Sequence, residues 1–292
     1  MPDLTSCFRL VVVLSAALAF SLGSTAAGAA QYGDEKYRPH SGQEGKDVIW
    51  VPTPQALVER MLDMAKLTAK DIHYDLGSGD GRTVIAAAKR GARATGVEFN
   101  PDMVALSERS AAREGVGGKA RFINGDIFQV DFTDATVVTL YLLPSLNLKL
   151  RPTLLRMKPG TRVVSHAFSM DDWRPDQTDN VEGRTAYLWI VPAAVEGTWR
   201  WEVAGNGPRS YELALRQQYQ QVEGLVRLDG KLAQVRNLKL HGDTISFTVN
   251  ELSGTNSTVR RDFTGRVTGN RMEGTVKLSN GAGEAKWTAS RD

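Results

Sequence analysis

Three acidic residues follow three successive apolar runs in the first half of the chain, at positions where strands are expected to end. Asp75 lies at the end of the first run, Glu98 at the end of the second, and Asp126 just after the third. In chains that alternate strands and helices, ligands bind beyond the carboxyl ends of the strands. A single loop carboxylate is usually only solvated. Three of them in this order predict a ligand with several polar groups.

A turn of alternating glycines follows the first acid, with the sequence Gly77-Ser78-Gly79-Asp80-Gly81. Glycine permits positive φ and a close approach of ligand to backbone, and the amides of the helix that follows favour a negatively polarised group. The dinucleotide pattern G-x-G-x-x-G fails because position 82 is arginine, and no Gly-Lys-Ser/Thr follows as a P-loop requires. Asp75 would repel a diphosphate and favours a ligand with a cationic end, such as an amino group and a sulfonium.

The elements that position these residues alternate between strand and helix patterns. Strands are expected over 72–76, 94–98, 120–124, 135–142, 161–165 and 185–191. Helices are expected after Thr53 as N-cap and Pro54, over 82–90, from Asn100-Pro101 to about 114, and over 145–157 with a break at Pro152. The alternation predicts an α/β fold with a doubly wound, Rossmann-like parallel sheet over 49–195, preceded by a disordered leader over 31–48.

The pattern changes after about residue 196. Short alternating runs replace the helical periodicity, and turn signals such as Asp229-Gly230 and Gly242-Asp243 separate them. Roughly eight strands at this spacing predict a C-terminal all-β domain over 196–292, an antiparallel barrel or sandwich.

The N-terminus has the composition of a targeting segment. Arg9 precedes an apolar run over 10–22, and small residues follow over 27–30. The run is too short to span a bilayer, so residues 1–30 are interpreted as a signal peptide, with an uncleaved membrane anchor as the alternative. The protein is then expected to be exported, periplasmic or envelope-associated. The single cysteine, Cys7, lies inside this segment, so the mature chain has no disulfide.

Charge and ligand spacing argue against two classes of partner, although a base-modifying enzyme with a small basic channel remains an alternative. Residues 31–192 carry 21 Lys and Arg against 21 Asp and Glu, which argues against a basic nucleic-acid-binding face. No His, Cys, Asp or Glu cluster has metal-ligand spacing, so no metal is expected. The sequence does not indicate an oligomeric state.

The stretch 75–82 resembles the first motif of class I S-adenosylmethionine-dependent methyltransferases. The resemblance implies that the glycine loop holds the methionine end of S-adenosylmethionine, that Glu98 takes the ribose hydroxyls, and that Asp126 and Ile127 contact the adenine. The implied cofactor-binding residues are Asp75, Gly77, Ser78, Gly79, Asp80, Gly81, Glu98, Asn100, Asp126 and Ile127.

A more specific resemblance covers about residues 49–168. The runs 50–54 (Trp-Val-Pro-Thr-Pro), 74–82 and 96–101 are similar to the small protein-lysine methyltransferases of the adenine nucleotide translocase and the ATP synthase c-subunit. This similarity implies N-methylation of a protein lysine. The strand end Leu140-Tyr141-Leu142-Leu143-Pro144 lacks the Asn-Pro-Pro-Tyr or Asp-Pro-Pro-Tyr motif, which argues against methylation of adenine N6, cytosine N4 or the glutamine side-chain amide.

Two residues are candidates for the methyl-transfer step. Tyr141 is expected to line the transfer site, although a tyrosine there could also only pack its ring. His166 could act as a general base or be a core histidine, and His73 is interpreted as structural. A small-molecule methyl acceptor remains an alternative. So does a non-catalytic envelope protein with a relict cofactor fold and a ligand-binding barrel, because S-adenosylmethionine supply in an exported compartment is unexplained.

Overall fold

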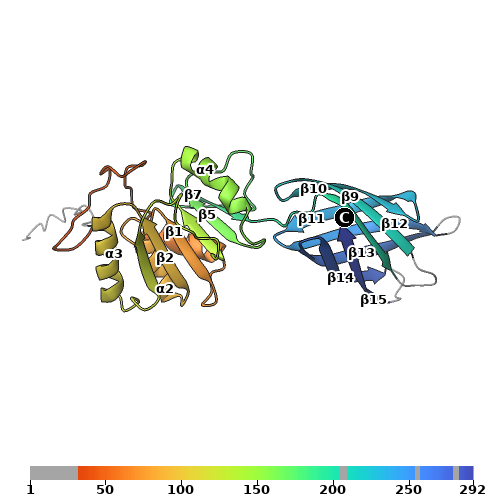
Figure 1. Cartoon of the computed structure of the whole chain (residues 1–292), viewed down its shortest axis with the longest axis horizontal. Coiled ribbons are helices and arrows are strands. Elements are labelled where there is room, and N and C mark those ends of the chain that lie inside the picture. The colour runs from red at the N-terminus through yellow and green to blue at the C-terminus, as the bar shows by residue number, and fades with distance from the viewer. Residues whose placement is uncertain (1–31, 204–208, 254–256, 279–282, 292) are drawn as a thin grey trace, which may run out of the picture. The chain divides into compact units, whose positions relative to one another are not determined.

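The protein is represented by a computed structural model that describes residues 32–203, 209–253, 257–278 and 283–291. The segment 1–30, expected to be a signal peptide, lies outside the described residues. Two β-structures follow each other along the chain, a mixed sheet with helices and then a barrel (Figure 1). No helix within the described ranges is long and apolar enough to cross a membrane.

Seven strands form the first sheet, in the order β3-β2-β1-β4-β5-β7-β6. Their bounds are β1 Ile72–Leu76, β2 Arg93–Glu98, β3 Ala120–Asn124, β4 Val137–Leu140, β5 Arg162–His166, β6 Gln177–Val181 and β7 Arg184–Ile190. The strands β1 to β5 run parallel, as expected. However, β7 pairs antiparallel with β5, and β6 antiparallel with β7. The sheet is therefore mixed, because after β5 the chain enters a hairpin and not another helix.

The sequence pattern does not predict β6. Its five residues are Gln-Thr-Asp-Asn-Val, and all of them are exposed or half-exposed. A polar edge strand carries no alternating apolar signal. Its assignment as a strand depends on pairing with β7, which sequence periodicity cannot reveal.

Four helices accompany the sheet: α1 Gln55–Met64, α2 Arg82–Lys89, α3 Pro101–Arg113 and α4 Pro144–Leu155. Asn100 caps α3 as expected, since its side chain accepts from the amides of Asp102 and Met103. Thr53 does not cap α1. Pro54 occupies that position without a side-chain bond, and the Thr53 hydroxyl contacts His166 instead. Pro152 does not break α4, because it lies near the helix end and removes a single backbone donor.

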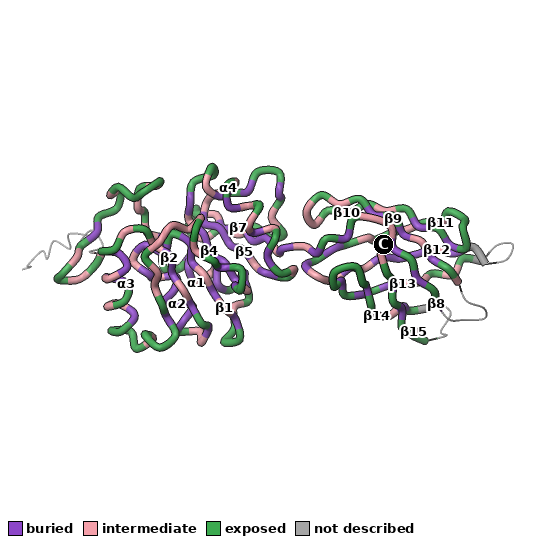
Figure 2. The backbone as a smooth tube through the Cα atoms, in the orientation of Figure 1, coloured by how far each residue is buried: buried purple, intermediate pink, exposed green. Residues whose placement is uncertain are grey.

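The central strands carry the core and place the site. All four residues of β4 are buried, and so are four of the five in β5, as the purple segments of Figure 2 show. In β1, Asp75 pairs with Gly96 of β2 on one side and with Thr139 of β4 on the other. The strand order reverses between β1 and β4, so the loops after these strands diverge and leave a crevice at their carboxyl ends.

Eight further strands form a closed antiparallel barrel, which confirms the expected C-terminal β-structure as a barrel. They are β8 Gly197–Val203, β9 Arg209–Gln218, β10 Gln221–Leu228, β11 Lys231–His241, β12 Thr244–Ser253, β13 Ser257–Thr268, β14 Arg271–Leu278 and β15 Glu284–Arg291. Six aromatic residues belong to its buried cluster: Trp199, Trp201, Tyr211, Phe247, Phe263 and Trp287. The interior is filled by side chains, as is usual for a barrel of this strand number.

The stretch expected as a disordered leader makes specific contacts from Asp34 on. Arg109 of α3 donates from Nε to the Asp34 carboxylate at 2.6 Å. Further along, the backbones of Gly42 and Gln43 bond to that of Trp50, at 2.8 and 2.9 Å, and close a hairpin-like loop. The polar composition of this stretch suggests disorder, but its polar groups are paired, through an ion pair with α3 and through backbone hydrogen bonds within the loop.

Candidate active site

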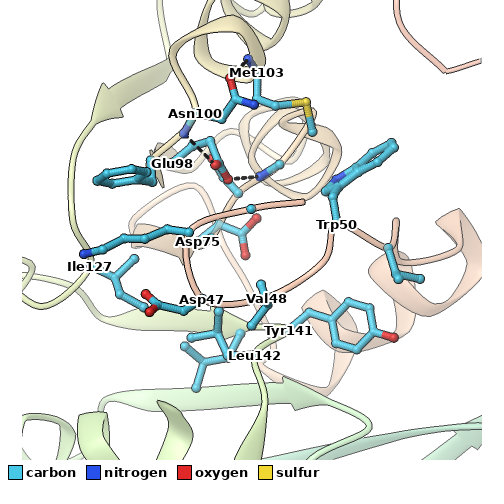
Figure 3. Close-up of a pocket in the computed structure, with 18 of the residues that line it drawn as sticks. Asp47, Val48, Trp50, Asp75, Glu98, Asn100, Met103, Ile127, Tyr141 and Leu142 are labelled. Carbon is cyan, nitrogen blue, oxygen red and sulfur yellow. Dashed lines mark hydrogen bonds between the residues drawn. The ribbon is translucent and has the colours of Figure 1, made fainter. Parts of the chain in front are cut away.

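A cavity of about 650 Å³ lies at the carboxyl ends of β1, β2 and β4, with residues 43–53 forming part of its wall (Figure 3). We call residues 43–53 the cover loop. Ten of the residues expected from the sequence line this cavity: Asp75, Gly77, Ser78, Gly79, Asp80, Glu98, Asn100, Asp126, Ile127 and Tyr141. Gly81 and His166 are not among the lining residues. The three strand-end acids therefore come together as expected.

The glycine loop adopts a conformation that only glycine takes without strain. Gly77, Gly79 and Gly81 all have positive φ, at 79°, 53° and 78°. A Cβ on Gly79 would lie 2.5 Å from the indole nitrogen of Trp50, so this glycine also allows the cover loop to approach. A Cβ on Gly81 would lie 2.8 Å from Phe122. Gly81 thus serves the packing of α2 against the sheet and does not contact the cavity.

Glu98 ties the glycine loop to the end of β2. Its Oε2 accepts the amide of Gly79 and its Oε1 accepts the amide of Asn100, both at 2.9 Å (Figure 3, dashed lines). The carboxylate thus has a fixed position at the cavity wall. Each carboxylate oxygen has two lone-pair directions, so both oxygens retain acceptor capacity for the hydroxyls of a ribose.

Asp75 is a buried carboxyl at the base of the cavity, with 6% of its surface exposed. Thr139 donates to its Oδ1 at 2.6 Å, and Thr83 of α2 also donates to it. Burial raises the pKa of Asp75 to about 7, and the nearby carboxylates of Glu98 and Asp80 act in the same direction, while the two hydroxyls oppose them. A cationic group in the cavity would favour the charged form of this residue.

Asp126 is engaged by the cover loop. Lys46 donates to its Oδ2 at 2.6 Å, and the Lys46 ammonium lies 4.9 Å from the centre of the Phe99 ring. The Asp126 Oδ1 accepts the amide of Phe128. The ion pair with Lys46 holds the pKa of Asp126 below its usual range. The carboxylate expected to meet the adenine amine therefore also holds the cover loop in place.

Tyr141 and His166 stack on each other. Their ring centroids are 3.8 Å apart, and Phe168 lies 6.2 Å from Tyr141. Tyr141 lines the cavity together with Phe168, whereas His166 is 3% exposed and lies behind it with Nδ1 3.1 Å from the Thr53 hydroxyl. Burial, with a smaller contribution from Arg184, lowers the pKa of His166 to about 4. A histidine that is neutral and withdrawn from the cavity is poorly suited to be the general base.

The sequence did not single out most of the cover loop. Lys46, Asp47 and Val48 line the cavity, as do Phe99 and Leu142. Only the Trp50–Pro54 run carried a sequence signal, because these residues belong to a recognisable motif. Across the described ranges, no group of three or more His, Cys, Asp or Glu side chains is arranged to hold a metal ion.

Comparison with known proteins agrees with this geometry. The model of the ANTKMT methyltransferase domain matches residues 75–177, which include the three strand-end acids and Tyr141. A protein-lysine N-methyltransferase of Saccharolobus islandicus is 43% identical over 162 residues, which are 53% of this chain and 96% of that protein. This chain belongs to the protein-lysine N-methyltransferase family.

This lysine methyltransferase also matches other proteins, and the matched share of their length varies. The human ATP synthase c-subunit lysine N-methyltransferase is 38% identical over 128 residues, 44% of this chain and 54% of that protein. The present chain thus spans about half the length of that relative. A solved structure of an RNA methyltransferase from Salinibacter ruber with S-adenosyl-L-homocysteine is 50% identical, with a TM-score of 0.49 over 50% of this chain and 96% of that one.

The cofactor of this lysine methyltransferase is S-adenosylmethionine, as in its family. The cavity residues fit that molecule. Asp75 supplies a buried acid for a cationic group, Glu98 supplies fixed acceptors for a diol, and Ile127 an apolar surface for a flat ring. Each of these assignments of a residue to a part of the cofactor is a prediction that binding measurements can test.

Proposed function

We propose that this chain transfers the methyl group of S-adenosylmethionine to the ε-amino group of a lysine in a protein substrate. One observation carries the proposal: the three strand-end acids and the aromatic pair Tyr141 and Phe168 line a single cavity. Family membership supports the same reaction.

The reaction is an in-line displacement at the methyl carbon. A neutral amine nitrogen forms the new N–C bond as the C–S bond breaks, and the nitrogen proton then leaves to solvent. The amine must lose its ammonium proton first, and desolvation favours the neutral form. Four exposed apolar residues at the cavity provide such surroundings: Ile49, Val51, Phe99 and Leu143. We assign the neutralisation of the lysine to this apolar rim and not to His166.

Tyr141 is proposed to line the path of the attacking amine. It lies just after β4, at the end of the strand that neighbours the glycine loop, and its ring packs against that of His166 with the Phe168 ring nearby. A positioned aromatic wall restricts the approach of a flexible lysine chain, and positioning supplies much of the rate in such displacements.

A nucleic-acid substrate is not proposed, because basic and acidic residues balance over 31–192. For the compartment, we propose export directed by residues 1–30, on the basis of the amino-acid pattern alone. Fractionation of the tagged protein tests it, and recovery of the uncleaved chain in the cytosol would contradict it.

Labelled methyl transfer tests the reaction itself. The acceptors are lysine peptides, the same peptides with alanine for lysine, small amines and phenols. Label on lysine peptides alone is the expected result, and label only on phenols or small amines would refute lysine specificity. Glu98→Gln should strongly reduce labelling at a low concentration of S-adenosylmethionine, whereas Glu114→Gln serves as a matched control because Glu114 lies at the far end of α3, paired with Lys89.

A further inference from the structure

A histidine that the proposed reaction does not use lies beneath the cavity. His73 and Asp75 are two residues apart on β1 and so share one face of the sheet, and Thr139 of β4 is the registered partner of Asp75. His73 and Thr139 have no exposed surface, whereas Asp75 reaches the cavity. The three polar side chains form a line from the interior to the site.

The hydrogen bonds along this line have one consistent direction. Thr139 donates to Asp75 Oδ1 at 2.6 Å, and Thr139 Oγ1 lies 2.9 Å from His73 Nε2. A threonine hydroxyl has a single hydrogen, so a Thr139 that donates to Asp75 must accept from His73. In this arrangement His73 carries its proton on Nε2.

Reversing these hydrogen bonds would leave a less favourable unpaired group at His73. If Asp75 were protonated and donated to Thr139, Thr139 would donate to His73 Nε2 and the histidine proton would move to Nδ1. His73 Nδ1 is buried with no hydrogen-bond partner. In the first arrangement it is an unpaired acceptor, and in the second it is an unpaired buried N–H donor, which native structures avoid more strictly.

We propose that His73 and Thr139 are positioning residues that direct a chain of donors toward the Asp75 carboxylate and hold it in the charged form that a cationic cofactor requires. The inference rests on the proposed function, because it assumes that Asp75 meets the cofactor. His73 supplies the terminal donor while remaining neutral, since burial lowers its pKa to about 3.

Other groups also act on this line. Glu98 of β2 and Asp80 of the glycine loop face Asp75 and oppose its ionisation, Thr83 of α2 donates to it, and Asp71 acts on His73 through its charge. The donor chain therefore lowers the pKa of Asp75, whereas the two neighbouring carboxylates raise it. Its removal should raise the pH at which Asp75 ionises.

The tautomer of His73 gives a test that needs no cofactor. Nitrogen-15 NMR of the full chain, with selectively labelled histidine and His73→Gln to assign the signal, distinguishes Nε2–H from Nδ1–H. We expect the Nε2–H tautomer with a proton protected from exchange. Above the pH at which Asp75 ionises, an Nδ1–H tautomer or a charged ring would overturn the proposal, even if the protein proved to bind no S-adenosylmethionine.

Variants of Thr139 and His73 give the second test, with S-adenosylmethionine affinity measured by calorimetry across pH. Thr139→Val should move the pH profile of binding upward. Near neutral pH the affinity then falls about tenfold for each pH unit by which the profile moves, and at high pH it is unchanged. Thr139→Ser and His73→Gln keep a donor and should restore most of the wild-type profile, whereas His73→Leu should not. Equal loss at every pH would show a merely structural role.

A double-variant comparison separates the effect of the donor chain on Asp75 from a general effect of Thr139 on packing. In an Asp75→Asn background there is no carboxylate to direct, so adding Thr139→Val should cause little further loss of affinity. A full additional loss in that background would contradict the proposal. Failure of the wild-type chain to bind the cofactor would instead refute the proposed function, and the His73 tautomer would still decide the present inference.

Discussion

Glu98 Oε2 accepts the backbone amide of Gly79 at 2.9 Å, which joins the end of β2 to the middle of the glycine loop. The same carboxylate accepts the amide of Asn100 through its other oxygen. One side chain therefore fixes the loop, the start of α3 and the wall of the cavity. A change at Glu98 should affect both the loop and any bound diol.

Glu98→Gln should weaken S-adenosylmethionine binding by about ten- to a hundredfold, because one acceptor becomes a donor facing a backbone amide and the charge is lost. Calorimetry on the purified chain measures this. Glu114→Gln, at the far end of α3 from the cavity, should bind as the wild type does. Equal affinity for Glu98→Gln and wild type would remove Glu98 from the cofactor site.

Gly79→Val should also abolish binding, and the structure gives a more specific reason than contact with the ligand. The new Cβ would meet the Trp50 indole at 2.5 Å, and φ of 53° is strained for a β-branched residue. Trp50→Ala combined with Gly79→Ala tests which cause dominates. If the clash dominates, the double variant should bind better than Gly79→Ala alone.

The affinity for S-adenosylmethionine should depend on pH through Asp75. Its pKa is raised to about 7, so the cofactor-free protein holds a proton there at lower pH, and a cationic ligand must displace it. Below neutral pH, affinity should fall about tenfold per pH unit, with release of one proton on binding. Asp75→Asn should bind weakly with little pH dependence over that range.

The same residue affects folding in the opposite sense. The unfolded chain ionises Asp75 near the ordinary value of 3.8, whereas the folded chain without cofactor keeps it protonated up to about pH 7. Folded protein therefore binds the extra proton between these values, and this contribution to stability is lost as pH rises. Unfolding of Asp75→Asn by urea should show a smaller decline over the same interval.

Lys46→Ala should speed cofactor exchange more than it weakens equilibrium binding. The Lys46–Asp126 pair is partly exposed, with 38% and 17% of the two side chains accessible, so it contributes little net stability. Its loss also frees Asp126 for the ligand. Stopped-flow measurement of S-adenosylhomocysteine release checks the rate, and Lys36→Ala, at an exposed position outside the cover loop, is the control. An unchanged release rate would show that the cover loop does not gate the cavity.

Deletion of residues 197–292 should leave cofactor binding largely intact. The buried cluster of the barrel takes only Ala193 and Val195 from the residues before 197, and Tyr219 of the barrel packs against one cluster of the sheet. The truncated chain should nevertheless melt several degrees lower, because Trp173 loses its bond to Gln220 and its stacking with Tyr219. Calorimetry and thermal unfolding measure both quantities. A truncated chain that does not fold would show that the two halves depend on each other.

Local signals predict much of this fold. The β1 and β3 bounds agree with the apolar runs, and Asn100 caps α3 because its side chain and the following proline act within a few residues. β6 is missed because its residues are polar and exposed, although its partner β7 follows it directly. The other failures involve partners distant in sequence: the ion pair from Asp34 to Arg109 and the approach of Trp50 to Gly79 depend on the folded sheet. Periodicity contains no information on such contacts.

The site shows the same division. The acids at 75, 98 and 126 are identifiable because strand ends converge in any parallel sheet. The Lys46–Asp126 pair and the hydrogen bond between His73 and Thr139 cannot be identified from the sequence, since each joins residues more than 60 positions apart. His166 illustrates the limit: its position at a strand end suggests a base, and only the stacked Tyr141 reveals that it lies behind the cavity wall.

The pair between Asp34 and Arg109 fastens the chain on the N-terminal side of the cover loop, and the prolines that lead into α1 fasten it on the other side. A segment fastened at both ends stays near its closed position after its middle detaches. Reclosing is then a unimolecular event with a high effective concentration, and it does not depend on how much protein is present. A bound molecule can thus be released and replaced while the cover loop stays close to the cavity.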